Sequence, residues 1–245
     1  MIELVHLTKK FGDLIAVDDV TLKLPRGEFF ALLGPNAAGK TTTLKVLAGL
    51  MRPTSGTAWV AGFDVQRDPL EARRRLAFVP DFPFLYEKLT PREFLRFTGQ
   101  LRRMSDDSIR ANGRELVERF GLEPFADKAI EGLSHGTRQR VVIASALLHQ
   151  PEVFIVDEPM VGLDPQHARA VKNILKERSR AGVTVLFSTH QLSVAEELAD
   201  RIGILHRGRL IAVGTAEELR RQSGAAGPLE DIFLALTAED ERRKG

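Results

Sequence analysis

Apolar and polar positions alternate in three short segments of the first third of the chain, residues 2–7, 20–24 and 57–60. A period of two places successive side chains on opposite faces of a strand, so that one face is buried and the other is solvated. Turn-forming residues such as Gly12 and Asp13 separate these segments. The pattern predicts an antiparallel β-subdomain at the start of the chain.

Three other segments, residues 29–33, 153–156 and 183–187, are apolar on both alternating positions. Strands of this kind are buried on both faces, as in a parallel sheet that is covered by helices. We therefore predict an α/β fold with a mostly parallel central sheet.

Helical periodicity replaces the strand pattern between residues 90 and 150. It predicts three consecutive helices, at about 91–102, 107–120 and 137–149. Further helices are predicted after Asp164, an N-cap residue followed by Pro165, and after Thr215, which forms a capping box with Glu218. The segment between residues 90 and 150 is interpreted as a helical insertion in the α/β core.

The 245 residues are interpreted as one domain in three parts. We expect a core at about 1–84 and 150–222, a helical subdomain at about 85–149, and a C-terminal helical tail at about 228–245. A Ser/Gly/Ala/Pro-rich stretch, residues 223–228, precedes that tail.

Composition excludes several classes of function. The chain has no cysteine, which excludes disulfides, thiolate metal sites and a cysteine nucleophile. Its apolar runs are far shorter than the roughly 18 residues of a membrane span, and no secretory signal is evident, so we expect a cytoplasmic protein. The 35 Lys and Arg and 33 Asp and Glu are mixed along the chain, and no nucleic-acid partner is expected.

The first strong chemical signal follows the apolar segment 29–33 and precedes an amphipathic helix. It is the phosphate-binding loop pattern G-x-x-x-x-G-K-[ST], formed by Gly34, Pro35, Asn36, Ala37, Ala38, Gly39, Lys40, Thr41 and Thr42. Such a loop wraps phosphates with main-chain N–H groups at the positive end of the helix. Lys40 is expected to contact the β- and γ-phosphates of a nucleotide, and the Thr41 hydroxyl to ligate Mg²⁺.

A pair of carboxylates supplies what that loop lacks. Asp157 and Glu158 directly follow the apolar segment 153–156. Phosphoryl transfer needs a carboxylate at the end of a neighbouring strand for Mg²⁺ and a group that deprotonates the attacking water. We predict that Asp157 holds the metal through a bridging water and that Glu158 is the general base.

These elements in this order resemble the ATP-binding subunit of an ATP-binding cassette (ABC) transporter. Between the loop and the acidic pair stands Leu133-Ser134-His135-Gly136-Thr137, which matches the family signature Leu-Ser-Gly-Gly-Gln at Leu133, Ser134 and Gly136. The resemblance implies the fold of a P-loop NTPase and a sandwich of two such subunits. In that sandwich Ser134 and Gly136 contact the ATP held by the loop of the second subunit, whether homodimer or heterodimer.

Further positions extend the resemblance. Asp164 lies in a segment that resembles the family's D-loop, and His190 in one whose histidine contacts the γ-phosphate and orients water. Phe11 takes the place of an aromatic residue that stacks on adenine, with Val17 bordering the same base. The tail around Leu229-Glu230-Asp231-Ile232 is similar to the bacterial branch that exports drugs and sodium.

The sequence also departs from the family pattern. Ala37 stands where glycine is commonest, and we predict a negative φ there because alanine is costly at positive φ. Asp81 takes the place of a glutamine that links Mg²⁺ and water to the helical insertion, and we predict that it is a metal ligand. His135 and Thr137 replace Gly and Gln, which changes the contacts that these positions make to the nucleotide.

The first hypothesis is therefore an ATPase that drives an export-type transporter. The resemblance implies that a transmembrane permease subunit is supplied by another chain, and that this chain lies on the inner face of the cell membrane. The second hypothesis is a soluble ABC ATPase that acts on ribosomes or nucleic acid. A GTPase is disfavoured because the chain has no N-K-x-D string, and a non-catalytic clamp because Glu158 is present.

Overall fold

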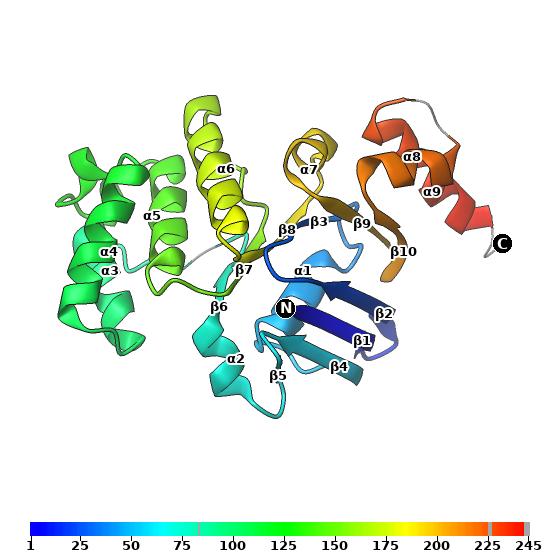
Figure 1. Cartoon of the computed structure of the whole chain (residues 1–245), viewed down its shortest axis with the longest axis horizontal. Coiled ribbons are helices and arrows are strands. Elements are labelled where there is room, and N and C mark those ends of the chain that lie inside the picture. Colours follow the sequence, from blue (N-terminus) through cyan, green and yellow to red (C-terminus); the bar gives the residue numbers. More distant parts are fainter. Residues whose placement is uncertain (83, 225–226, 243–245) are drawn as a thin grey trace.

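The computed structural model describes residues 1–82, 84–224 and 227–242. Within these residues the strands form a four-stranded sheet and a six-stranded sheet, and helices pack against the larger sheet (Figure 1). The fold is α/β, with an antiparallel N-terminal sheet, a mostly parallel sheet and a helical insertion, as the sequence predicts.

The smaller sheet has the strand order β2-β1-β4-β5. Its strands are β1 (Ile2–Phe11), β2 (Leu14–Leu24), β4 (Ser55–Val60) and β5 (Phe63–Asp64). All of its pairings are antiparallel, and the tight turn at Gly12 joins β1 to β2. The predicted strands are confirmed, although β1 and β2 are longer than the alternating segments.

The larger sheet has the strand order β10-β9-β3-β8-β7-β6. Its strands are β3 (Phe29–Leu33), β6 (Leu76–Val79), β7 (Val153–Asp157), β8 (Thr184–Thr189), β9 (Arg201–His206) and β10 (Arg209–Gly214). Only β10 is antiparallel to its neighbour in this described sheet. Every residue of β3, β7 and β8 is buried, as their continuous apolar patterns predict.

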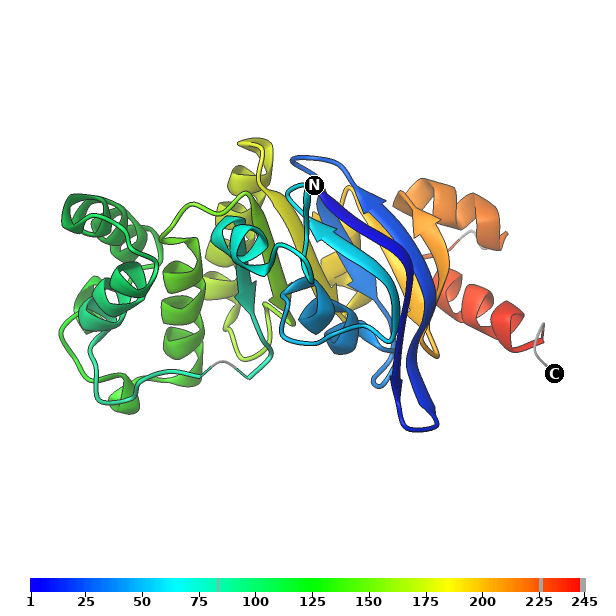
Figure 2. The same cartoon turned by 90° about the horizontal axis from the view of Figure 1, so that it is seen from below.

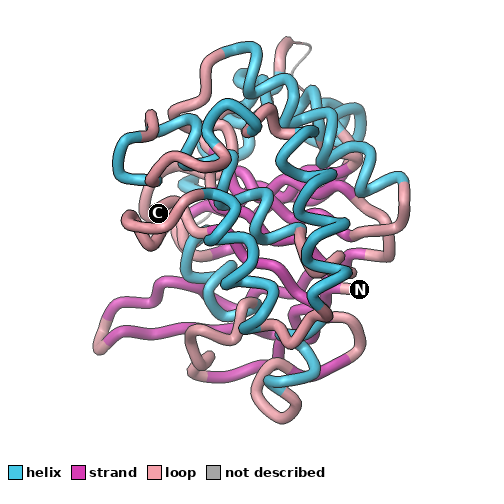
Figure 3. The backbone as a smooth tube through the Cα atoms, turned by 90° about the vertical axis from the view of Figure 1, so that its left-hand side faces the viewer, coloured by secondary structure: helices cyan, strands magenta, loops and turns pink. Residues whose placement is uncertain are grey.

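The helical insertion forms a separate lobe at one end of the molecule, in green in Figure 1. It contains α3 (Pro91–Leu101), α4 (Asp106–Arg119) and α5 (His135–Leu147), with short 3-10 turns at Glu123–Phe125 and Ile130–Gly132. Figure 3 shows these helices in front of the strands when the molecule is viewed from that end. The three predicted helices are confirmed to within two residues at each end.

The remaining helices belong to the core and the tail. They are α1 (Lys40–Leu47), α2 (Pro69–Arg75), α6 (Pro165–Arg180), α7 (Leu192–Leu198), α8 (Ala216–Ser223) and α9 (Leu229–Arg242). Asp164 caps α6, and Thr215 forms the predicted capping box with Glu218 at α8. Residues 225–226 of the expected linker and 243–245 of the expected tail lie outside the described residues.

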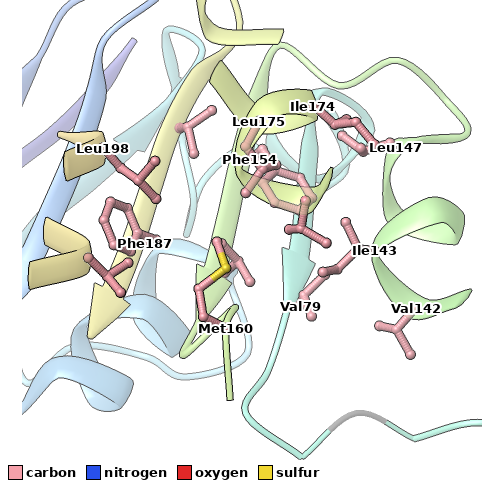
Figure 4. Close-up of a cluster of buried hydrophobic side chains, with 14 of the residues drawn as sticks. Val79, Val142, Ile143, Leu147, Phe154, Met160, Ile174, Leu175, Phe187 and Leu198 are labelled. Atoms are coloured by element: carbon pink, nitrogen blue, oxygen red, sulfur yellow. The ribbon is translucent and has the colours of Figure 1, made fainter. Parts of the chain in front are cut away.

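The two faces of the large sheet contribute to two hydrophobic cores. Alternate residues of β3 show this: Phe29 and Leu33 belong to the core that contacts α5, α6 and α7, whereas Phe30 and Leu32 belong to the core shared with the small sheet and α1. Figure 4 shows the first of these cores, where Phe154 of β7 and Phe187 of β8 lie among helical side chains. In Figure 2 the small sheet lies beside the large one, with α1 between them.

Candidate functional site

The loop between β3 and α1 is fixed by close backbone contacts at both of its glycines. A Cβ on Gly34 would lie 2.3 Å from the main-chain oxygen of Leu205, and a Cβ on Gly39 would lie 2.3 Å from that of Ala16. Gly39 also has φ of +103°. Both positions therefore require glycine, which accounts for the spacing of the two glycines in the motif.

Ala37 has φ of +63°, so the prediction of a negative φ at this residue is wrong. The backbone of the loop adopts the left-handed conformation at its fourth position even though the residue there is an alanine. The hydrogen bond from Ala38 N–H to the Pro35 oxygen, 3.2 Å, closes the turn around it. Surrounding contacts thus hold an alanine in a conformation that costs it about 1–2 kcal/mol relative to the right-handed region.

The Lys40 ammonium lies inside the loop. Its Nζ donates hydrogen bonds to the main-chain oxygens of Gly34 at 2.7 Å and Pro35 at 3.1 Å. The residue is only 7% exposed, and this burial lowers the pKa of Lys40, while the carboxylates of Glu158 and Asp157 act in the opposite direction. The side chain is a buried cation whose hydrogen bonds aim it at the centre of the loop.

Asp157 connects the first residues of α1 to two neighbouring strands. Thr41 Oγ1 donates to Asp157 Oδ2 at 2.7 Å. Ser188 Oγ donates to Asp157 Oδ1, and these two residues are paired in register between β7 and β8. The carboxylate is 1% exposed and is held by a hydroxyl on each side. This arrangement places two oxygen groups that suit Mg²⁺, Thr41 and Asp157, next to each other.

Glu158 leaves β7 in an unusual backbone conformation, with φ of +50°. Its main-chain N–H donates to the Ser188 oxygen at 3.1 Å, which extends the pairing of β7 with β8 by one residue. Its carboxylate accepts a hydrogen bond from Thr189 Oγ1 at 3.3 Å and lies 2.8 Å from Nδ1 of His190. Glu158 and His190, expected to act together on water, are brought into contact.

Sequence reasoning gave no role to Ser188 and Thr189, although both contact the acidic pair. They lie in the segment Phe187-Ser188-Thr189-His190, at the end of β8. The available signal was the position of β8: the carboxyl ends of adjacent parallel strands meet at one edge, so polar residues that end one strand face those that end the next.

The loop and the acidic pair line one cleft of about 330 Å³. Its other lining residues come from β1, β2 and the segment after β6: Phe11, Leu14, Ala16 and Asp81. Gly34 and Pro35 contribute to the loop but not to this lining. The cleft therefore joins an anion-binding loop, carboxylates and an apolar rim.

The apolar rim consists of Phe11, Leu14 and Ala16, and it does not include Val17. Phe11 is 46% exposed, with Lys9 Nζ 5.0 Å from the centre of its ring, so it is a surface side chain and not part of the core. Val17 is fully buried in the core between the two sheets. Adjacent residues of a strand point to opposite faces, and it is Ala16 that faces the cleft.

Asp81 follows β6 and enters the same cleft. Burial raises the pKa of the Asp81 carboxyl, and the negative charge of Asp157 raises it further, against the opposing effect of His190 and His135. Asp81 therefore shares a cleft with the candidate metal ligands Thr41 and Asp157.

Ser134 and Gly136 lie at the start of α5 and do not line this cleft. Ser134 caps the helix by accepting a hydrogen bond from Thr137 N–H at 3.3 Å, and its side chain is exposed. A Cβ on Gly136 would lie 3.1 Å from the Gly162 oxygen, and a Cβ on Gly162 would lie 2.1 Å from Cδ2 of His135. This segment and the one before α6 therefore pack on each other at the surface.

Comparison with known proteins decides the family. A family model described as "ABC transporter" matches residues 17–161, which include the loop, the helical insertion and the acidic pair. The chain belongs to the ABC transporter family. A second model, described as an AAA domain, matches residues 129–196.

Curated relatives support the same family. The chain is 34% identical to the ABC transporter ATP-binding protein NatA of Bacillus subtilis, over 96% of this chain and 97% of NatA. It is 39% identical to the daunorubicin/doxorubicin resistance ATP-binding protein DrrA of Streptomyces peucetius, over 91% of this chain and 68% of DrrA. It is 40% identical over 91% of its length to the probable multidrug ABC transporter ATP-binding protein YbhF of Escherichia coli, but spans only 38% of YbhF.

Solved structures of ABC proteins match the fold closely. The structure of the ATP-binding subunit of an ABC transporter superposes with a TM-score of 0.91 at 36% identity, over 97% of this chain and 99% of that one. The dimeric post-hydrolysis structure of the ATP-binding cassette MJ0796, bound to ADP and Pi, has a TM-score of 0.80 at 30% identity, over 88% and 98% of the two chains. In the part of this ABC protein that the structure describes, no helix combines the length and apolar character that membrane spanning requires.

Proposed function

We propose that the chain binds and hydrolyses ATP as the ATP-binding subunit of an export-type ABC transporter. The observation that carries the proposal is the arrangement at the end of β7. Thr41 and Asp157 are hydrogen-bonded beside the loop, and Glu158 with His190 lies directly next to them. Together they bring metal ligands and a base to the place where the loop holds the terminal phosphates.

The loop and its lysine supply the binding energy for the triphosphate. Main-chain N–H groups at the start of α1 face the phosphates at the positive end of the helix. Lys40 Nζ exchanges its hydrogen bonds with Gly34 and Pro35 for the β- and γ-phosphate oxygens. Phe11 offers an exposed aromatic face to adenine, with Leu14 and Ala16 beside it.

Mg²⁺ fits the donor chemistry of the site. The ion prefers oxygen ligands, keeps several waters, and in nucleotide sites uses one or two protein groups together with phosphates. The Thr41 hydroxyl and the Asp157 carboxylate provide these groups, and Asp81 lines the same cleft. When bound, Mg²⁺ neutralises charge on the phosphates.

Glu158 performs the acid–base part of the reaction. Its carboxylate accepts a proton from water as the water oxygen forms a bond to the γ-phosphorus and the bond to the bridging oxygen of ADP breaks. Thr189 and His190 fix the direction of the carboxylate. The His190 side chain is about half exposed, whereas that of Glu158 is largely buried.

A second cassette completes the site in this proposal. Ser134 and Gly136 start α5 on the surface, where the N–H groups of a helix N-terminus and the O–H of Ser134 can donate hydrogen bonds to a phosphate. They lie outside the chain's own cleft, so they serve the nucleotide of the other subunit. The dimeric structures of MJ0796 support such an assembly.

The transport role is supported by the relatives, whose names describe drug resistance and multidrug transport. A separate transmembrane permease would place this chain at the inner face of the membrane. The test is to express the tagged chain in its own host and to fractionate the cells. We expect the chain to sediment with membranes and to be released from them when the permease gene is deleted. Sedimentation with ribosomes would favour a role on ribosomes instead.

The decisive test of ATP hydrolysis is Glu158→Gln. This change keeps the size of the side chain and one acceptor oxygen but removes the base. We expect ATP affinity within about twofold of wild type, a loss of turnover of about 10²-fold or more, and an ATP-dependent dimer in size-exclusion chromatography. Glu197→Gln, an exposed residue of α7 paired with Lys172, is the matched control and should turn over ATP normally. Full activity in Glu158→Gln would contradict the proposed mechanism.

A further inference from the structure

The turn between β9 and β10 supports the phosphate-binding loop directly. The main-chain N–H of Gly208 donates to the Ala38 oxygen at 2.9 Å. On the other side of the loop, Gly34 packs against the Leu205 oxygen so closely that a Cβ would lie 2.3 Å from it. The position of the loop therefore depends on the position of this turn, residues 205–209.

The same turn is attached to β2, which carries the apolar rim of the cleft. Asp18 N–H donates to the Gly208 oxygen at 2.8 Å, and Arg209 Nε donates to Asp18 Oδ2 at 2.5 Å. Two consecutive residues of the turn, Arg207 and Gly208, have positive φ of +45° and +82°. A non-glycine residue keeps such a conformation only where its surroundings hold it there.

The C-terminal helix α9 makes the third set of contacts to this turn. Nδ1 of His206 lies 2.9 Å from Oδ2 of Asp240, and the two side chains are only 10% and 14% exposed. Arg207 also pairs with Glu241 at 2.8 Å, and the same Glu241 carboxylate lies 4.0 Å from Nε2 of His206, but the Arg207 and Glu241 side chains are more than half exposed. Because water screens exposed ion pairs, the buried contact of His206 with Asp240 is the one that can hold the turn in place.

Helix α9 is itself anchored in the protein core. Leu229, Ile232 and Leu236 are buried on the face that packs against α7, α8 and β10. These residues recur at helical spacing and cover one side of α9. The Asp240 carboxylate therefore belongs to a helix that is packed in the core, and its hydrogen bond to His206 links that helix to the turn.

We propose that Asp240 and His206 are positioning residues of the nucleotide site. They hold the turn whose Gly208 and Leu205 carry the phosphate-binding loop, although α9 supplies none of the residues that line the cleft. The inference rests on the proposed function, since it assumes that this loop binds ATP. It assigns the C-terminal helix to the machinery of ATP binding.

The test compares ATPase kinetics of full-length variants. In Asp240→Ala and in His206→Ala we expect KM for ATP to rise about fivefold with kcat within about twofold of wild type, because a misplaced loop weakens binding before it affects the base. The double variant should be no worse than either single one, since each removes the same contact. Glu241→Ala, next to Asp240 on α9, is the matched control and should keep the wild-type KM.

A conservative replacement separates positioning from general stability. His206→Asn retains an N–H donor close to the place of Nδ1 and should restore most of the affinity, whereas a merely structural role would lower the melting temperature without moving KM. If the alanine variants fail to fold, Asp240→Asn is measured in their place. An unchanged KM in Asp240→Ala, additive effects in the double variant, or an equal rise in Glu241→Ala would overturn the inference. Wild-type protein that neither binds nor hydrolyses ATP would instead overturn the proposed function.

Discussion

Nδ1 of His190 lies 2.8 Å from Oε1 of Glu158, beyond the ends of two neighbouring parallel strands. The Glu158 side chain is 12% exposed, whereas that of His190 is 52% exposed. The contact therefore joins a largely buried carboxylate to an imidazole that borders solvent. With Thr189 on its other oxygen, the carboxylate has little freedom to turn away from the cleft.

Replacement of His190 by alanine should impair turnover much more than binding. Without its imidazole partner the Glu158 carboxylate is free to leave the orientation that accepts a proton from water, and we expect kcat to fall about 10²-fold. ATP affinity should change little. Steady-state kinetics and equilibrium binding of a fluorescent ATP analogue measure the two effects separately.

The control for this prediction is His6→Ala. His6 also pairs with an aspartate, Asp19, at 2.8 Å, but on the exposed surface of the small sheet. That variant should keep wild-type kinetics. A His190→Ala protein with normal kcat would show that the Glu158 carboxylate does not need the imidazole.

Lys40→Ala should abolish most of the nucleotide affinity. The ammonium is buried within the loop and is the cation that hydrogen bonds aim at the phosphates. Loss of a charge-assisted contact to two phosphates should weaken ATP binding by about 10²-fold. Lys45→Ala, on the same helix, is the matched control. Equal ATP affinity in Lys40→Ala and wild type would argue against the loop as the phosphate site.

Ala37→Gly should stabilise the protein. Alanine at φ of +63° costs about 1–2 kcal/mol, and part of that gain is lost because glycine makes the unfolded chain more flexible. The expected net increase in the free energy of unfolding is about 0.5–1 kcal/mol. Urea unfolding of both proteins measures it, with Ala38→Gly, at a buried residue of ordinary φ, as a control that should be destabilised. A less stable Ala37→Gly protein would contradict this account.

The sequence predicts those parts of the fold in which local pattern and burial agree. The segments 29–33, 153–156 and 185–187 are apolar on both faces because helices or the second sheet cover each side. Helix starts at Asp164 and Thr215 carry side-chain caps that depend on a few neighbouring residues. The candidate binding residues of the loop and of the end of β7 are also predicted from the sequence, because each motif consists of consecutive residues.

Features set by contacts distant in sequence were not predictable. The φ of Ala37 is determined by the loop, which Ala16, Leu205 and Gly208 hold in place, and not by the alanine. The choice between Ala16 and Val17 depends on which face of β2 meets the cleft, and bulges in the pairing of β1 with β2 obscure that register. The contact of His206 with Asp240 joins residues 34 positions apart, and no local pattern indicates it.

His149 makes the stability of the fold depend on pH. Its Nε2 lies 3.2 Å from the Leu76 oxygen, its Nδ1 is buried without a hydrogen-bond partner in the described residues, and Arg102 is nearby. Burial, with a smaller effect of the Arg102 charge, lowers the pKa of His149 to about 4 from the ordinary 6.5. Between these pH values the unfolded chain binds a proton at this residue and the folded chain does not.

The free energy of unfolding should therefore fall as the pH falls from about 6.5 to about 4, by a total of about 3 kcal/mol from this residue. His149→Gln keeps an N–H donor for the Leu76 oxygen but has no proton to gain. Urea unfolding at pH 7 and at pH 4.5 should show a smaller loss of stability in His149→Gln than in wild type, whatever the other groups contribute to both. Parallel losses in the two proteins would mean that His149 accepts a proton in the folded state as readily as in the unfolded state.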